Sequence, residues 1–432
     1  MCIRDSIIFR HALLPQGWAE HVAISFAAGR ITQIETGITG GTGIALPGMP
    51  NLHSHSFQRA MAGRAEHRGA GTDSFWTWRE LMYKLAWSLD PDDVQAIATL
   101  AFTEMLEAGF TAVAEFHYLH HAPDGTPYDD IAEMATRIAA AADASGIDLL
   151  LLPVFYAHSG FGGQPPSAGQ RRFINSLDSY AHLHERCRAL AATGCAPHSL
   201  RAATREEISA LNNLNGAAPF HIHIAEQTAE LEACLAFSGA RPVEYLLENA
   251  PVSANWCLVH ATHITAQEAA AMAKTQAVAG LCPITEANLG DGIFPAQHFT
   301  GPFGIGSDSN ILIDAARELQ MLEYSQRLAQ RQRNVMATDT VRSTATALYQ
   351  NALAGGAQAM GLQAGLAIGA PASFVTIAGD APEEALAHTI FTARLPALRD
   401  VWVRGKHLVE AGRHIHAQPA RAAFEATLRK RL

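Results

Sequence analysis

Eight short apolar segments alternate with longer helical segments through the middle of this 432-residue chain. Such alternation is typical of a parallel sheet, because each helix carries the chain back to the end where the next strand begins. Eight units of this kind predict an α/β fold, a (β/α)8 barrel of the TIM type, whose functional side chains follow the carboxyl ends of the strands. The predicted strands are residues 45–53, 111–116, 148–156, 194–198, 219–224, 256–261, 277–282 and 304–308.

The two ends of the chain predict a second, smaller region made of β-strands. Residues 22–26 and 30–34 alternate apolar and polar side chains around a glycine, which favours a β-hairpin. Residues 373–377 and 401–409 have the same character. We therefore expect both ends to form one small β-sandwich around an inserted catalytic barrel. The expected parts are residues 1–45 for the first half of the sandwich, 46–370 for the barrel, and 371–432 for the second half with a terminal helix.

The composition excludes several classes of function. The chain has 31 Lys and Arg against 41 Asp and Glu, a net charge of −10, and the basic residues form no stripe. Neither nucleic acid nor an anionic membrane is therefore an expected partner. The longest apolar run, residues 149–157, is too short to span a bilayer and contains Pro153. Six cysteines without a Cys-x-x-Cys pair, and residues 1–6 without a signal-peptide pattern, predict a cytoplasmic protein with reduced thiols.

Histidine is the residue type that stands out, with 21 copies. Four His-x-His pairs occur, and in a chain this rich in histidine one such pair is a weak signal by itself. Two of them fall in a helical segment and in a glycine-flanked tail, and we interpret them as surface pairs: His182/His184 and His414/His416. His53 and His55 differ, because they end the first predicted strand, where residues i and i+2 project from the same face. Two neutral imidazoles there suit a divalent metal ion, and a hydrogen-bonded core pair is the alternative.

Polar side chains also follow later predicted strands. His221 and His223 end the fifth strand, Glu226 follows three residues later, His260 ends the sixth strand and Asp308 ends the eighth. Each has a plain structural explanation taken alone: a core histidine, an acid at a helix N-terminus, or a turn residue. In a barrel, however, all these strand ends open onto one mouth. Together they predict a metal site with a carboxylate close to the metal.

Taken in order, these residues resemble the amidohydrolase superfamily over roughly residues 46–310. The matching features are the Pro-Gly-x-x-Asn-x-His-x-His opening, the His-x-x-Glu pair, the later histidine, the Ser-Asp pair of the eighth strand, and the split β domain. Members with two metals use a carboxylated lysine on the fourth strand, and this chain has no lysine between Lys84 and Lys274. The resemblance thus implies one divalent ion, with Zn²⁺ as the expectation. It also implies roles for single residues: metal ligands His53, His55, His223 and Asp308, and catalytic groups Glu226, His260 and Asp308.

Charged side chains near the predicted mouth indicate the chemistry of the substrate. Arg79 lies in the long loop after the first strand, and His198 and Arg201 follow the fourth strand. A guanidinium group matches a carboxylate, so two of them beside one metal favour a substrate that carries carboxylates. A structural ion pair is the alternative for each arginine.

Four segments resemble, more narrowly, the formimidoylglutamate deiminase family of bacterial histidine degradation: residues 51–59, 75–80, 115–120 and 197–201. This resemblance implies hydrolysis of N-formimidoyl-L-glutamate, a small dicarboxylate, to N-formyl-L-glutamate and ammonia. It implies substrate contacts from five residues: Gln58, Arg79, Tyr118, His198 and Arg201. The alternatives are a deaminase or chlorohydrolase of the same superfamily acting on a ring such as guanine or cytosine, and a silent scaffold, which a lost metal ligand would reveal. A homodimer is left open.

Overall fold

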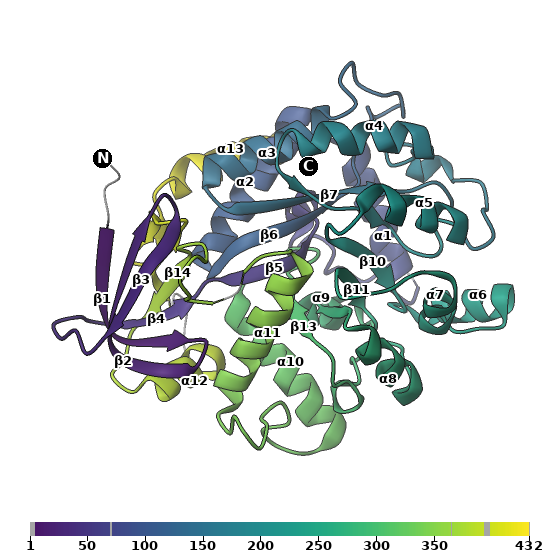
Figure 1. Cartoon of the computed structure of the whole chain (residues 1–432). Helices are drawn as coiled ribbons and strands as arrows, with labels where there is room; N and C mark the ends of the chain where they lie inside the picture. The colour runs from purple at the N-terminus through teal and green to yellow at the C-terminus, as the bar shows by residue number, and fades with distance from the viewer. Residues whose placement is uncertain (1–4, 70, 364, 393–397, 432) are drawn as a thin grey trace.

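Parallel strands covered by helices make up most of the protein in the computed structural model, which describes residues 5–69, 71–363, 365–392 and 398–431 (Figure 1). The parallel strands are β5 (Met49–Ser54), β6 (Phe110–His117), β7 (Asp148–Phe155), β8 (Ala192–Thr193), β9 (Ala196–Pro197), β10 (Phe220–Ile224), β11 (Trp256–His260), β12 (Val278–Leu281) and β13 (Phe303–Ile305). One sheet has the order β5-β6-β7-β8, with β9 also paired to β7, and the other has the order β10-β11-β12-β13. Each predicted barrel strand therefore corresponds to an observed strand or pair of strands, in the predicted order along the chain.

Isolated bridges join these sheets in place of continuous ladders. Cys195 pairs with Phe220 and Ser199 pairs with His223 on one side, and Ser54 pairs with Asp308 on the other. The second seam is short because the backbone of Asp308 turns into the left-handed region, with φ of 44°, soon after β13 ends. The predicted fourth strand is present only as two short fragments, β8 and β9. The arrangement is of the TIM-barrel type, with its strand pairing interrupted at the two seams.

Helices cover the outside of the sheets (Figure 1). The helix α2 (Pro91–Glu107) has a capping box, because Asp90 accepts from the backbone N–H of Asp93 and Asp93 accepts from that of Asp90. The other helices are α1 (Phe75–Ser88), α3 (Glu133–Ser145), α4 (Leu177–Arg188), α5 (Arg205–Asn215), α6 (Thr228–Ser238), α7 (Pro242–Asn249), α8 (Ala266–Thr275), α9 (Pro283–Leu289), α10 (Ala315–Gln330), α11 (Thr344–Ala359), α12 (Pro382–Phe391) and α13 (Ala417–Arg431). Short 3₁₀ turns are Ser56–Met61, Ala168–Gln170 and Ala296–His298.

Both ends of the chain join one eight-stranded sheet, drawn in purple and yellow on the left of Figure 1. Its strands are β1 (Asp5–Leu14), β2 (Gly17–Ala27), β3 (Arg30–Thr36), β4 (Ile44–Pro47), β14 (Phe374–Ile377), β15 (Leu398–Val403), β16 (Lys406–Glu410) and β17 (Arg413–His414). The order is β17-β16-β15-β14-β4-β1-β2-β3, so the two halves of the chain meet where β4 pairs with β14. Strands from both ends of the chain thus lie in one sheet. The strand pairing is that of a single sheet, and the sandwich stays a prediction.

The segment predicted as the first barrel strand is divided between the two regions at Gly48. β4 pairs with β1 and β14 in the small sheet, whereas β5 pairs with β6 in the barrel. A Cβ atom on Gly48 would lie 2.2 Å from Oγ1 of Thr111, so only glycine lets the chain pass this close to β6. The predicted strand 45–53 is therefore wrong in its first part, because a continuous apolar run gives no sign of a change of sheet.

Two histidines that we predicted at the surface are buried instead. His184 and His414 expose 4% and 3% of their surface. Nε2 of His414 lies 2.9 Å from the carbonyl oxygen of Ser145, and the ring of His184 stacks on that of Tyr180. The other members of these two His-x-His pairs, His182 and His416, are exposed as predicted. The cysteines of the described residues are free and buried, and Cys2 lies outside the described residues.

In the described part of the chain, no helix is both long enough and apolar enough to cross a bilayer.

Candidate active site

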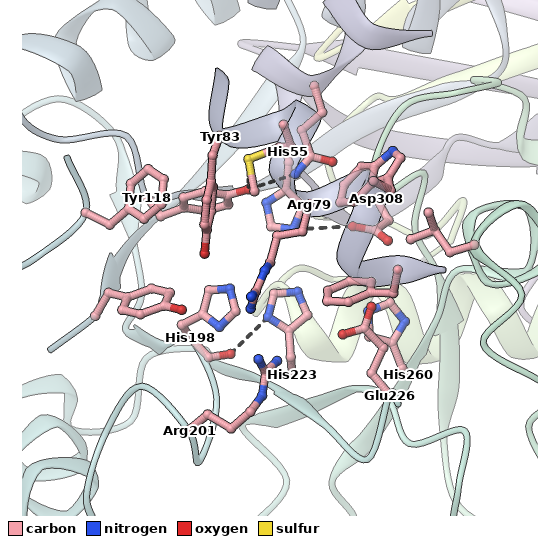
Figure 2. A pocket seen from close by; sticks show the side chains of 17 residues that line it. His55, Arg79, Tyr83, Tyr118, His198, Arg201, His223, Glu226, His260 and Asp308 are labelled. Atoms are coloured by element: carbon pink, nitrogen blue, oxygen red, sulfur yellow. Dashed lines mark hydrogen bonds and ion pairs between the residues drawn. The ribbon is translucent and has the colours of Figure 1, made fainter. Parts of the chain in front are cut away.

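Three imidazole nitrogens and one carboxylate converge where β5, β10 and β13 end. Figure 2 shows three of these side chains: His55, His223 and Asp308. Nε2 of His53 lies 3.2 Å from Nε2 of His55 and 3.0 Å from Nε2 of His223. Oδ1 of Asp308 lies 3.4 Å from Nε2 of His53 and 3.3 Å from Nε2 of His55. All four side chains are buried. The four residues predicted as metal ligands therefore lie together.

Backbone carbonyls orient two of these rings. Nδ1 of His55 lies 2.9 Å from the carbonyl oxygen of Phe116, and Nδ1 of His223 lies 2.9 Å from that of His198. A ring that donates its Nδ1 proton in this way presents the lone pair of Nε2 to the cluster. Burial lowers the pKa of His53 to about 3, and it lowers the pKa of His55 and His223 as well. The three rings are therefore neutral at neutral pH.

The cluster fits a divalent metal ion. Neutral nitrogens that point their lone pairs at one another this closely repel unless a cation lies between them. Burial opposes the charge on Asp308, but the hydrogen bond with His53 and the positive charge of His260 hold the pKa of that carboxyl well below its usual range. Three nitrogens and one anionic oxygen suit Zn²⁺ or a similar ion. The four residues whose ligand atoms all lie within 4.8 Å of one another are His53, His223, His260 and Asp308, so this group has His260 where the predicted ligand set has His55.

Two further titratable groups flank this metal cluster. Nε2 of His260 lies 3.9 Å from Oε1 of Glu226, and Nδ1 of His260 lies 3.3 Å from Oε1 of Glu286. Burial opposes a charge on His260, but the charge of Glu226 and the hydrogen bond to Glu286 outweigh it and raise the pKa to about 10. Burial raises the pKa of Glu226 to about 7. Since Glu226 gains or loses its proton near neutral pH, this pair can move a proton beside the cluster.

The turns that carry these side chains adopt an uncommon backbone conformation. Five residues that are not glycine have φ between 44° and 69° at the ends of β10, β11 and β13: Ala225, His260, Ala261, Asp308 and Asn310. The left-handed region costs Ala225 and Ala261 about 1 kcal/mol or more each, whereas Asp and Asn adopt it more readily. Strain of this kind persists only where the surrounding contacts impose it, and it clusters at functional sites.

A pocket opens above the metal cluster and gathers the remaining predicted residues, as Figure 2 shows. Its lining includes every predicted site residue except His53, which lies beneath the others with no exposed surface. Nε2 of Gln58 donates to the hydroxyl of Tyr118 at 2.7 Å. The buried Oε1 of Gln58 has no hydrogen-bond partner in the described part of the chain, so an acceptor is free at the pocket wall.

Two arginines also line this pocket. The buried Nε atoms of Arg79 and Arg201 make no hydrogen bond to any described residue. The guanidinium of Arg79 lies over the ring of Trp76, 4.4 Å from its centroid, and 5.5 Å from the centroid of Tyr83. Arg201 exposes only 9% of its surface. Both guanidinium groups are therefore available to an anionic ligand, and among the described residues neither has the structural ion pair that was the alternative.

Comparison with known families decides the affiliation of the chain. The family described as "Amidohydrolase family" matches residues 44–408. The chain belongs to the amidohydrolase family. A second match, described as "Formimidoylglutamate deiminase HutF, N-terminal domain", covers residues 5–43.

Two relatives and one solved structure resemble the chain over 85% to 99% of its length. The chain is 48% identical to a formimidoylglutamate deiminase of Pseudomonas aeruginosa, over 98% of this chain and 99% of the relative. A crystal structure of an amidohydrolase from Brucella melitensis has a TM-score of 0.96 and 51% identity, and the match covers 99% of each chain. A 5-methylthioadenosine/S-adenosylhomocysteine deaminase of Natronomonas pharaonis is 25% identical over 85% of this chain and 81% of the relative. The predicted family resemblance is thus confirmed.

Two polar residues that we did not predict hold the amidohydrolase metal cluster in place. Glu115 on β6 is fully buried and accepts from the backbone N–H and the hydroxyl of Ser56, at 2.7 and 2.6 Å, next to His55. Nδ2 of Asn310 donates to the carbonyl oxygens of His55 and Asp308, at 3.0 Å each. A single acidic residue inside an apolar strand belongs to no periodic pattern, so its contacts could not be predicted from residue spacing.

One face of α1 supplies further residues of this amidohydrolase pocket that we did not single out. Besides Arg79, this face includes Phe75, Trp78, Met82 and Tyr83. These residues recur at spacings of three and four, which places them on the same side of a helix. That spacing is the signal that identifies them once Arg79 is assigned to a helix.

Proposed function

We propose that this amidohydrolase hydrolyses N-formimidoyl-L-glutamate to N-formyl-L-glutamate and ammonia. The observation that carries the proposal is a single pocket that joins a His/Asp metal cluster to two guanidinium groups. The substrate offers an amidine carbon to the first and two carboxylates to the second. The 48% identity to a formimidoylglutamate deiminase supports the same reaction.

One divalent ion, Zn²⁺, is proposed to bind four residues: His53, His55, His223 and Asp308. The neutral rings with their Nε2 atoms turned inward support this ligand set. The absence of lysine between Lys84 and Lys274 removes the side chain that would bridge a second ion. When bound, such an ion supplies a water whose pKa is lowered toward neutrality.

Three residues handle protons and charge in the proposed reaction. Asp308 accepts the proton that the attacking water loses. Glu226 carries a proton to the amidine nitrogen, which leaves as ammonia. His260 stabilises the negative charge on the attacking oxygen, because the carboxylates of Glu226 and Glu286 favour its charged form.

The substrate is proposed to lie between the metal cluster and α1. Arg79 and Arg201 bind the two carboxylates, since their buried Nε atoms lack other partners in the described part of the chain. His198 is kept neutral because burial lowers its pKa, and it contributes a hydrogen bond to the same end. The free Oε1 of Gln58 accepts from the amidinium, and Tyr118 holds the amide of Gln58 in place.

The proposal also covers the closure of the barrel, the form of the small β domain, the cellular location and the oligomeric state. We propose a closed (β/α)8 barrel that ends at residue 370 and begins at Gly48, not at residue 46, because β4 pairs in the small sheet, and a β-sandwich from residues 1–47 and 371–432. The rings of Phe26 and Phe374 lie 6.1 Å apart although their strands are three positions apart in the sheet, which supports a sheet that bends over on itself. Free buried cysteines support a cytoplasmic location. A homodimer stays a prediction.

Ammonia release by the metal-loaded enzyme tests the function. We would compare formimidoylglutamate with guanine, cytosine and 5′-methylthioadenosine, and we expect the highest kcat/KM for formimidoylglutamate. A base or nucleoside as the best substrate would favour the ring-deaminase alternative. Full metal content without ammonia release from any of the four compounds would favour a silent scaffold.

A further inference from the structure

Glu230 is a buried carboxylate that takes no part in the proposed proton transfer. It lies in the first turn of α6, the helix that follows Glu226, and exposes 1% of its surface. An ionised carboxylate is costly to bury unless it accepts hydrogen bonds, so this burial requires an explanation.

Both oxygens of Glu230 accept from the backbone of the turn between β10 and α6. Oε1 accepts from the N–H of Ala225 at 3.1 Å, and Oε2 accepts from the N–H of Glu226 at 3.3 Å. An ordinary capping box would use the N–H of the N-cap residue, which here is Gln227. Glu230 instead reaches past the N-cap, so its two bonds hold the turn that precedes the helix.

This turn needs such a restraint. Ala225 has a φ of 51°, a left-handed conformation in which the Cβ atom of an alanine lies too close to the following carbonyl oxygen. On the other side, the carbonyl of Ala225 accepts from the N–H of His263 at 3.0 Å. The direction of the Glu226 side chain follows from this backbone. Without the bonds to Glu230, the turn can relax and the Glu226 carboxylate can move away from His260.

We propose that Glu230 is a positioning residue for Glu226: it fixes the turn at Ala225 so that the Glu226 carboxylate faces the leaving nitrogen. The inference rests on the proposed deimination, in which Glu226 carries the proton.

The substitution Glu230→Gln tests this role with little change in size. One acceptor becomes an amide NH₂, which cannot accept from a backbone N–H. We expect kcat for formimidoylglutamate to fall about 10- to 100-fold, because a displacement near 1 Å costs that much. KM and metal content should stay near the wild-type values. Glu232→Gln is the matched control: it removes one charge from an exposed position of the same helix and should leave kcat unchanged.

A double-mutant cycle separates positioning from a general loss of stability. If Glu230 acts through Glu226, adding Glu230→Gln to Glu226→Gln should lower kcat no further. Additive losses, or a wild-type kcat in Glu230→Gln, would overturn the inference. A raised KM at unchanged kcat would also overturn it, because the effect would then lie at Arg201, whose charge Glu230 also favours.

The wild-type enzyme distinguishes failure of this inference from failure of the proposed function. Absence of ammonia release from formimidoylglutamate by wild type counts against the function alone. In that case the same cycle is measured with whichever amidine or base the wild type hydrolyses, since its leaving nitrogen also needs a proton. Non-additivity supports the role of Glu230 there, and additivity overturns it.

Discussion

Two parts of the pocket differ in how their side chains are held before substrate binds. The metal end consists of His53, His55, His223 and Asp308, and the arginine end consists of Arg79 and Arg201. At the metal end, His55 and His223 come from the ends of strands, and Nδ1 of each ring is bonded to a backbone carbonyl. At the arginine end, Arg79 comes from α1 and Arg201 from the segment after β9, and their Nε atoms have no hydrogen-bond partner among the described residues. A catalytic cluster must hold its geometry before substrate arrives, whereas a recognition site keeps its donors for the ligand.

Substitution of one metal ligand should abolish both metal binding and activity. We expect His53→Ala to lose both the ion and the activity, because His53 lies between His55 and His223 at 3.2 and 3.0 Å. Metal analysis and ammonia release would be measured on the same preparation, with one ion per chain expected in the wild type. The control is His182→Ala, an exposed histidine of α4, which should keep both. Two tightly bound ions per active wild-type chain would contradict the mononuclear proposal.

Substitution of Glu226 should have the next largest effect on turnover, and the metal should remain bound. Glu226→Gln keeps the shape but removes the group that exchanges a proton, so turnover should fall by roughly 10²-fold or more with the metal still bound. Asp308→Asn is the comparison, since Asp308 lies 3.4 Å from Nε2 of His53 and should lose metal affinity as well as rate. Near-normal turnover of Glu226→Gln would remove Glu226 from the mechanism.

The metal end was the easier end to predict from the sequence, and the reason is physical. Strand residues i and i+2 share a face, and barrel strands open onto one mouth, so spacing and order place His53, His55 and Asp308 at the same mouth. Their roles as ligands came from the resemblance to the amidohydrolase superfamily. Contacts that depend on a turn geometry leave no such periodic signal. Glu230 looks like an ordinary acid of a helix first turn, and only the left-handed backbone at Ala225 shows what it holds.

The same limit applies to the border between the barrel and the small sheet. Residues 45–53 form one apolar run, and nothing in their pattern indicates the change of sheet at Gly48. The change becomes visible only through the close approach to Thr111, which is distant in sequence. Local patterns thus predict which elements form, while contacts between distant segments decide how they are divided.

Changes at the arginine end should affect substrate recognition and not the metal. Arg79→Met and Arg201→Met each remove a charge-assisted hydrogen bond of roughly 1.5–3 kcal/mol, or about 10- to 150-fold in kcat/KM for formimidoylglutamate. Metal content should stay at the wild-type value. Formimidoyl-γ-aminobutyrate, which lacks the α-carboxylate, should lose little further in the variant whose arginine binds that group. Unchanged formimidoylglutamate kinetics in both variants would contradict the dicarboxylate proposal.

The variant with the smallest expected effect tests whether α1 contributes only to substrate binding. Ser74 caps this helix: its hydroxyl accepts from the N–H of Trp76 at 3.3 Å, and its own N–H donates to Oγ1 of Thr77 at 3.1 Å. Ser74→Ala should cost about 1 kcal/mol of helix stability. Fraying of the first turn would loosen Trp76, on which the Arg79 guanidinium rests.

We therefore expect Ser74→Ala to raise KM for formimidoylglutamate by a few fold while kcat and metal content stay unchanged, and Ser74→Asp, which keeps a cap, to restore KM. Ser176→Ala is the matched control, because Ser176 caps α4, which supplies no residue to the pocket, by accepting from the N–H of Ser179 at 3.2 Å. It should lower thermal stability by a similar amount and leave KM alone. If both cap variants change KM equally, global stability and not the α1 wall controls binding. If Ser74→Ala lowers kcat instead, the two ends of the pocket are coupled and the contrast between them fails.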